Sequence, residues 1–251
     1  MVSFLTHFTA EIRKLKGTRV IWLAAIAPFF VVITAWLAAF LNGDRMYVRG
    51  VNPWIDFTGH VLIGWTLFVF PIYVSLLSAL FHSIEHRADM WKMVYSLPIP
   101  RAVVYFVKFL LFTAIVFFSH ILLWGMAESG GWLLGIARPS LDFQFYSLHR
   151  VLLEGCSGCF LAGLGVVAIQ FFLGFRYSSF LIPAGMGLLI TMTGAISRSW
   201  PVSQASPYLW AVSFFNSSID VHNWQYIFIL LGIVTYCLVG LAGKYSAPDR
   251  I

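Results

Sequence analysis

Residues 85–101 read EHRADMWKMVYSLPIPR and form a short polar break between two long apolar runs. One run ends at Phe81 and the next begins at Ala102. Both runs exceed the roughly 18 residues that a helix needs to cross a bilayer. The arrangement predicts two transmembrane helices joined by a short segment that lies outside the membrane.

The polar break has the pattern of an amphipathic helix over residues 84–95. Its apolar side chains recur at i, i+4, i+7 and i+11: Ile84, Ala88, Trp91 and Tyr95. Pro98 and Pro100 are expected to end this helix, because proline donates no amide hydrogen and favours an extended residue before it. The alternative is a plain loop that happens to carry charges and prolines.

The composition extends this interpretation to the whole chain. Of the 251 residues, 60% are hydrophobic and only 10% are charged, against about 25% charged in soluble domains. Lipid offers no partner to backbone amides, so the apolar runs predict an all-α integral membrane protein. The net charge of +6 comes from basic residues at span ends, which indicates contact with membrane lipid and not with nucleic acid.

Six apolar runs predict six transmembrane helices in a single domain, residues 1–251. The runs cover residues 20–41, 61–81, 102–126, 151–174, 180–196 and 226–241. Eleven of the sixteen lysines and arginines fall on one side when the spans alternate, which predicts a multi-pass protein of the cell (inner or plasma) membrane with both termini in the cytoplasm. Pro28, Pro71 and Pro183 are expected to kink their spans.

Residues 4–16 predict a further amphipathic helix that lies in the inner head-group layer. Its apolar face comprises Phe4, Leu5, Phe8, Ile12 and Leu15. Glu11, Arg13, Lys14 and Lys16 fall on the other face. The alternative is a plain basic anchor. Lys108, two turns into the third span, is expected to snorkel toward the cytoplasmic head groups.

These pieces together resemble the permease subunits of type-2 ATP-binding cassette (ABC) exporters. The resemblance rests on the order of the helices and on the motif Glu85…Trp91-Lys92…Leu97-Pro98-Ile99-Pro100-Arg101…Tyr105…Lys108. The stretch 170–183, QFFLGFRYSSFLIP, resembles the turn between the fourth and fifth spans in the bacitracin and lantibiotic self-protection branch.

The resemblance implies that residues 84–95 are a coupling helix that docks on an ATPase and that residues 4–16 are an elbow helix. The residues that it places at or near the coupling contact are Glu85, Arg87, Asp89, Trp91, Lys92, Pro98 and Arg101. Asp89-Met90 departs from the family pattern, in which many members carry a glycine and a small polar residue. The implied partners are an ABC ATPase dimer, which would hold ATP and Mg, and a second permease, identical or homologous. The implied cargo is an antimicrobial peptide or a lipid-like molecule.

The chain itself lacks the residues for hydrolysing ATP. The nearest string to a phosphate-binding loop, residues 240–245 (GLAGKY), has the wrong glycine spacing and no Ser or Thr after the lysine. The string Gly155-Cys156-Ser157-Gly158 matches the serine motif of rhomboid proteases, but the sixth span contains no histidine base. We interpret it, with the Cys156–Cys159 spacing, as helix packing and not as a catalytic or metal site.

Polar residues inside the spans are candidates for the transport pathway. Glu154 stands one turn after Arg150, so it either lines a cavity for a cationic or amphipathic substrate or forms an i, i+4 ion pair. His120 and Gln170 are further candidates, for which interhelical hydrogen bonds are an equal explanation. Glu154 and His120 are also the residues that an ion-gradient-driven transporter, the alternative function, would use.

Overall fold

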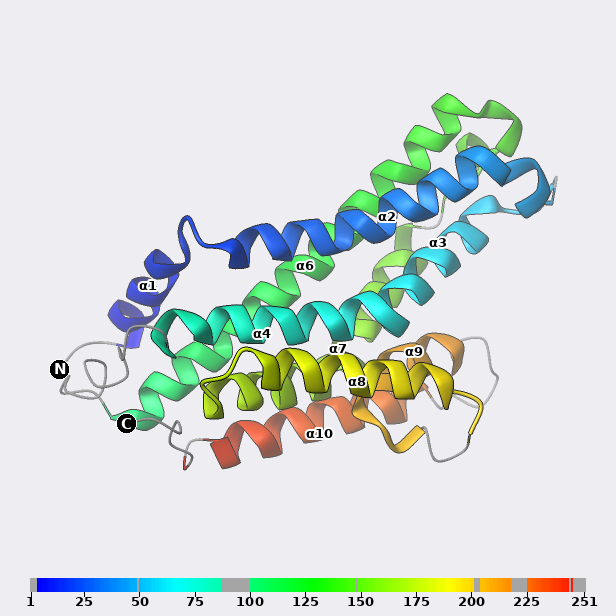
Figure 1. Cartoon of the computed structure of the whole chain (residues 1–251). Coiled ribbons are helices and arrows are strands. Elements are labelled where there is room, and N and C mark those ends of the chain that lie inside the picture. The colour runs from blue at the N-terminus through cyan, green and yellow to red at the C-terminus, as the bar shows by residue number, and fades with distance from the viewer. Residues whose placement is uncertain are drawn as a thin grey trace.

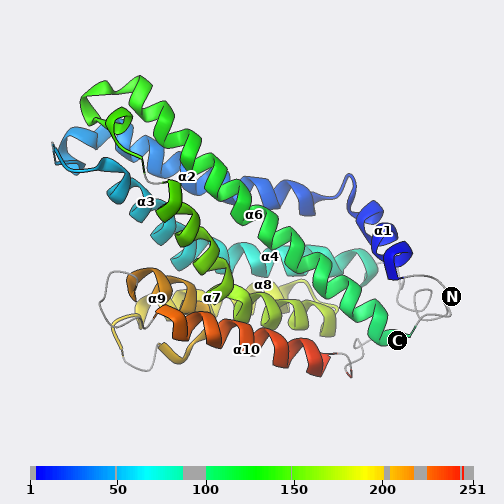
Figure 2. The ribbon, with the colours of Figure 1, turned by 180° about the vertical axis from the view of Figure 1, so that it is seen from behind.

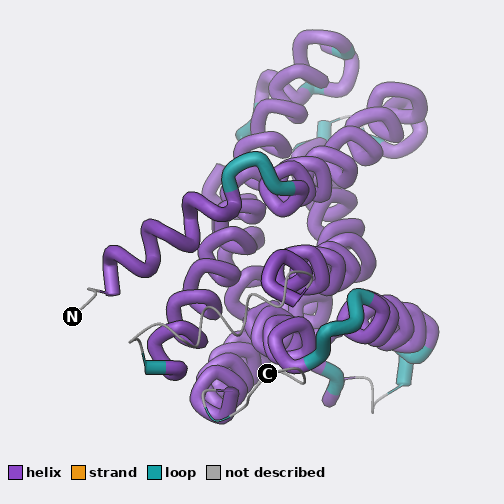
Figure 3. The backbone as a smooth tube through the Cα atoms, turned by 60° about the vertical axis from the view of Figure 1, so that its left-hand side comes forward, coloured by secondary structure: helices purple, strands orange, loops and turns teal. Residues whose placement is uncertain are grey.

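The computed structural model describes residues 4–48, 50–86, 100–147, 149–200, 204–217, 225–243 and 245, and at residues 4–6, 84, 85 and 217 the backbone alone. Within these ranges the chain is helical and contains no strand (Figure 3). Helices are expected here because they satisfy every backbone donor and acceptor within one segment.

In chain order, the described elements are all helical. They are α1 (Phe4–Leu15), α2 (Arg19–Met46), α3 (Pro53–Gly64), η1 (Trp65–Val69), α4 (Phe70–His86), α6 (Arg101–Ala137), η2 (Pro139–Leu141), η3 (Phe143–Phe145), α7 (His149–Arg176), α8 (Leu181–Ile196), η5 (Pro207–Leu209), α9 (Trp210–Ser217) and α10 (Gln225–Gly243).

The long helices run back and forth between two ends of one bundle (Figure 1). We call the end beside α1, where α2, α6 and α8 begin, the α1 end, and the opposite one the far end. At the α1 end His86 Nε2 lies 3.1 Å from the Gly174 carbonyl oxygen, and the Tyr105 hydroxyl lies 3.5 Å from that of Val239. These contacts join the last turns of α4 and α10 to α7 and α6. Figure 2 shows α6 crossing the back of the bundle.

The apolar helices confirm a multi-pass membrane protein. Five helices of the described ranges are long and apolar enough to cross a membrane: α2, the continuous helix α3–η1–α4, α6, α7 and α10. The predicted span 180–196 corresponds to α8, which is apolar but has only 16 residues. The count of six spans therefore stays a prediction that depends on α8.

Pro71 widens the second span locally without interrupting it. Residues Trp65–Val69 form a π-helical turn, closed by the amide of Phe70 donating to the carbonyl oxygen of Trp65. A proline has no amide hydrogen for the carbonyl four residues earlier, so an ordinary α-helical bond is missing at this point. In membrane helices, a local π adjustment is one way to satisfy the backbone groups that a proline leaves free.

At the far end α2, α3 and α6 splay away from α7–α10, and η2 and η3 close the tip of α6 (Figure 1). The indole of Trp54 fills the space between them. Its Nε1 donates to the Phe143 carbonyl oxygen at 3.0 Å, and its ring meets the Phe57 and Phe143 rings edge to face. Gly131 of α6 lies against this indole with no room for a Cβ atom.

We therefore expect Gly131→Ala to destabilise the protein by roughly 1–3 kcal/mol, because the added methyl group must displace a buried indole. Gly125→Ala is the matched control on the same helix, since a Cβ atom there meets nothing within 4 Å. Thermal unfolding of both variants in one detergent measures the difference. Equal melting temperatures for the two variants would contradict this packing.

Candidate functional site

The predicted coupling contact falls largely outside the described residues. Arg87, Asp89, Trp91, Lys92 and Pro98 all lie in the range 87–99, which the structure does not describe. The backbone of Glu85 is in the last turn of α4, and Arg101 is the exposed first residue of α6. The coupling helix stays a prediction, and the structure supplies the two helices that flank it.

A buried ion pair fastens α1 to α6 close to this segment. Lys108 Nζ lies 2.6 Å from Glu11 Oε2, and the two side chains are only 1% and 4% exposed. Glu11 Oε1 also receives a hydrogen bond of 2.7 Å from Lys14, whose side chain is 36% exposed. The Lys108 ammonium lies 5.9 Å from the centre of the Phe81 ring, on α4. One carboxylate thus ties together two elements far apart in the sequence.

The sequence pattern was misleading about Glu11. It places Glu11 on the outer polar face of residues 4–16, and this prediction is wrong, because Glu11 is buried. Lys108 is buried against α1 as well, and its position at head-group depth stays a prediction. The face of α1 that is buried comprises His7, Glu11 and Leu15, whereas Ile12 is 38% exposed. Each charge satisfies the other in the interior, so neither must reach water.

The ion pair keeps the Glu11 carboxylate charged. Burial raises the pKa of this carboxyl, but the ammonium groups of Lys108 and Lys14 and their hydrogen bonds outweigh burial, and the net pKa lies below the ordinary value of 4.5. The folded state therefore favours the deprotonated form of Glu11 more strongly than the unfolded state does.

An aromatic cluster fills the interior between α4, α6 and α7 at the same end. It comprises Phe81, His82, Tyr105, Phe112, Phe171 and Phe175. The rings of His82 and Phe171 meet edge to face with centroids 4.7 Å apart, and Tyr105 meets Phe171 at 5.4 Å. Because such rings interlock at fixed angles, the end of α4 and the beginning of α6 are packed as one unit.

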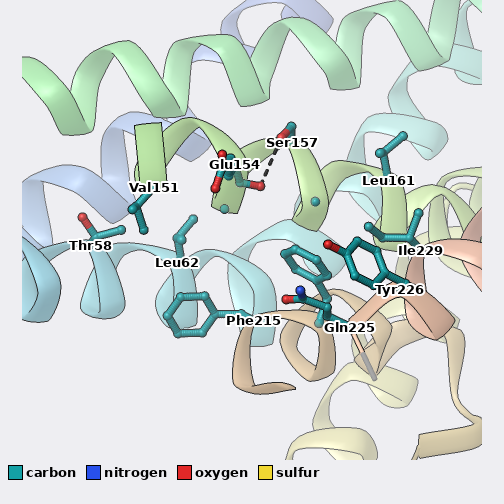
Figure 4. Close-up of a pocket in the computed structure, with 13 residues that line it drawn as sticks. Thr58, Leu62, Val151, Glu154, Ser157, Leu161, Phe215, Gln225, Tyr226 and Ile229 are labelled. Atoms are coloured by element: carbon teal, nitrogen blue, oxygen red, sulfur yellow. Dashed lines mark hydrogen bonds between the residues drawn. The ribbon is translucent and has the colours of Figure 1, made fainter. Parts of the chain in front are cut away.

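A second feature, at the far end, is a cavity of about 430 Å³ between α3, α7, α9 and α10 (Figure 4). We call it the far-end cavity. Its polar lining residues are Thr58, Glu154, Ser157, Gln225 and Tyr226. Its apolar walls are Leu62, Val151, Leu161, Phe214, Phe215 and Ile229. Its volume lies in the range of sites for small molecules, about 300–1,000 Å³.

Of the three predicted pathway residues, the structure places Glu154 in the lining of this cavity. Glu154 also forms the i, i+4 ion pair, because Arg150 Nε donates to Glu154 Oε1 at 2.7 Å. Its role in a substrate pathway stays a prediction. The Ser157 hydroxyl donates to the Glu154 carbonyl oxygen at 3.1 Å (Figure 4). No histidine of the described ranges lines the cavity.

His120 and Gln170 lie instead in the packed interior. The Trp65 indole donates to His120 Nε2 at 3.2 Å, and His120 Nδ1 lies 3.0 Å from the Val116 carbonyl oxygen. Gln170 Nε2 donates to the Tyr208 hydroxyl at 2.5 Å. Both are hydrogen-bonded between helices, and neither lines the far-end cavity.

Sequence reasoning missed Thr58, Gln225 and Tyr226 as cavity residues, because they come from helices far from Glu154 in the chain. It also missed Glu11. The available signal was its spacing: Glu11 lies four residues from both His7 and Leu15, so the three share one face of a helix. Cys156 and Cys159 are buried, and within the described ranges no group of three or more His, Cys, Asp or Glu side chains could hold a metal ion.

Comparison with known proteins agrees with this architecture. A family model described as "ABC-2 family transporter protein" matches residues 7–194, well over half of the chain. The chain therefore belongs to the ABC-2 family of transporters and is a permease of the ABC-2 type. Permeases of this family act in general with a separate ABC ATPase. No curated protein and no solved structure matches the chain.

We expect Lys108→Met to lower the free energy of unfolding by roughly 3–5 kcal/mol, because it leaves a buried carboxylate without its main partner. Lys14→Met is the matched control and should cost at most about 1 kcal/mol, since that ammonium is partly exposed. The double variant Glu11→Gln/Lys108→Met should recover part of the loss. Denaturant unfolding in detergent measures all three. A loss for Lys108→Met no larger than that of the control would contradict the buried pair.

The lowered pKa of Glu11 gives this stabilisation a pH dependence. The contribution is present above pH 4.5 and is lost as the pH falls through the lowered pKa, because the folded state must then bind a proton that the unfolded chain already holds. The difference in unfolding midpoint between wild type and Glu11→Gln should therefore shrink below pH 4.5. A difference that stays constant down to about pH 3 would show that another interaction causes it.

Proposed function

We propose that this permease is the membrane subunit of an ATP-driven exporter. Two ABC ATPase subunits, which hold ATP and Mg, drive it, and a second permease, identical or homologous, completes the pathway. The short helix α8 serves as the fifth of six spans. The α1 end and both termini face the cytoplasm, and α1 is the elbow helix. The family match over residues 7–194 is the observation that carries this proposal.

The packing at the α1 end supports residues 84–95 as the coupling helix. The undescribed segment 87–99 connects the end of α4 to the beginning of α6 in the sequence. Both helices are packed in the aromatic cluster, and α6 is further held to α1 by the Glu11–Lys108 pair. A displacement of the segment by an ATPase therefore acts on the second span, the third span and the elbow helix together.

The cargo in this proposal is amphipathic: an antimicrobial peptide or a lipid-like molecule, exported outward. Support comes from the far-end cavity, whose lining combines a carboxylate with aliphatic and aromatic walls. An ion-gradient mechanism finds less support. Glu154 lies in the second turn of α7 with its side chain 61% exposed, and His120 has a hydrogen-bond partner on each ring nitrogen, so neither has the setting of an ion site at the membrane centre.

We expect the tagged chain, extracted from its native membranes in mild detergent, to bring down a stoichiometric ABC ATPase. Trp91→Ala/Lys92→Ala should lose this partner and abolish export, because Trp91 of the apolar face and the charged Lys92 beside it would form the contact. Trp132→Ala is the control, since Trp132 is a 66% exposed tryptophan on the far half of α6. Recovery of the ATPase with the Trp91/Lys92 variant at the wild-type level would refute this coupling contact, and recovery of no ATPase with wild type would refute ATP-driven transport.

A further inference from the structure

The far-end cavity joins a charged rim to an apolar interior. Glu154 and Tyr226 are both 61% exposed and stand at the opening, whereas Leu62 and Phe214 are buried and form the inner wall. Glu154 is in the second turn of α7, and Tyr226 in the first turn of α10. The opening therefore lies near the beginnings of these helices, where the ends of membrane-spanning helices are expected to meet lipid head groups.

Thr58, in the lining contributed by α3, differs from three other threonines of the described helices. The hydroxyls of Thr66, Thr113 and Thr191 each donate to the carbonyl oxygen four residues earlier. Thr58 is 4% exposed, and its hydroxyl has no hydrogen-bond partner. Burying a hydroxyl without a partner costs free energy. Threonine has two accessible χ1 rotamers in a helix, so a ligand in the cavity could draw this hydroxyl into a bond.

Arg150 is not part of the cavity lining, but it stands one turn before Glu154 on α7 and brings a complementary charge beside the opening. Arg150 uses its Nε hydrogen on Glu154 Oε1, while a guanidinium has five donor hydrogens in all. Its remaining hydrogens suit a phosphate, for which the planar guanidinium is the preferred partner. The Glu154 carboxylate accepts from an ammonium group. A single head group with an anionic and a cationic part would contact both residues.

We propose that the far-end cavity binds the phosphoethanolamine group of an amphiphile, with the ammonium at Glu154 and Thr58, the phosphate at Arg150 and the chain against Leu62 and Phe214. The inference rests on the proposed function, of which it names the substrate class. A primary ammonium donates hydrogen bonds to the carboxylate and to the threonine hydroxyl, which a quaternary ammonium cannot do. The site therefore favours ethanolamine over choline, and a zwitterionic head over a purely anionic one.

Native mass spectrometry of the purified full chain in detergent tests this inference with defined lipids. The probes are dioleoyl-phosphatidylethanolamine, -phosphatidylcholine and -phosphatidylglycerol, with soluble O-phosphoethanolamine to separate the head group from the chain. We expect phosphatidylethanolamine to bind about tenfold more tightly than the other two lipids and the soluble head group to bind more weakly still.

The variants locate the binding. Glu154→Gln should weaken phosphatidylethanolamine binding about tenfold, Thr58→Val should weaken it by less, and Ser157→Phe should abolish it by filling the opening. Asp44→Asn is the matched control, because it removes the carboxylate of another ion pair at the far end, 2.5 Å from Arg138, outside the cavity. Melting temperatures confirm that each variant is folded.

Equal retention of the three lipids, or unchanged retention in Glu154→Gln and Ser157→Phe, overturns the proposal. Binding of the soluble head group as tightly as the lipid overturns the role of the apolar wall. The measurement needs no ATPase, so its result is independent of the co-purification experiment. If the chain binds phosphatidylethanolamine selectively but brings down no ATPase, the lipid site stands and ATP-driven export is refuted.

Discussion

A polar group in the hydrocarbon layer must find its partner within the protein, and the architecture of this permease follows from that constraint. Backbone groups are satisfied by helices, and hydroxyls such as that of Thr66 by the preceding turn of their own helix. Lys108 meets the same requirement through Glu11, a residue of the short helix α1. The position of α1 is thus fixed by a charge inside the bundle.

The helices that cross the membrane could be predicted because hydropathy depends on short stretches of sequence. The run 20–41 lies within α2, and the run 226–241 within α10. The ends were predicted less well. The run 102–126 stops where charged and glycine residues begin, yet α6 continues to Ala137, because contacts with Trp54 and Phe143 support it there. Tertiary packing therefore sets the end of α6, and the local composition does not predict it.

The sites required information that a single sequence holds only in part. Glu11 and Lys108 are 97 positions apart, and no local pattern joins them. Glu154 could be selected because acids are rare in apolar runs, but its neighbours Thr58 and Tyr226 are ordinary residues until α3 and α10 bring them to the same cavity. His120 and Gln170 were equally conspicuous in the sequence, and the structure places both in hydrogen bonds between helices.

The π turn at Trp65–Val69 makes the length of the second span as important as its composition. Each residue of a helix advances the chain by about 100° around the axis, and a π turn holds one residue more than an α turn. The π turn accommodates its extra residue within one turn, so deleting one residue here would restore an α-helical turn and leave the flanking helix in register. A deletion between the π turn and Tyr73 has no extra residue to remove and would rotate everything beyond it by about 100°. Tyr73 would then leave Ser119, and Phe81 would leave the aromatic cluster. Homologous permeases that share this packing should therefore tolerate the loss of one residue within the π turn but not in the helix that follows it.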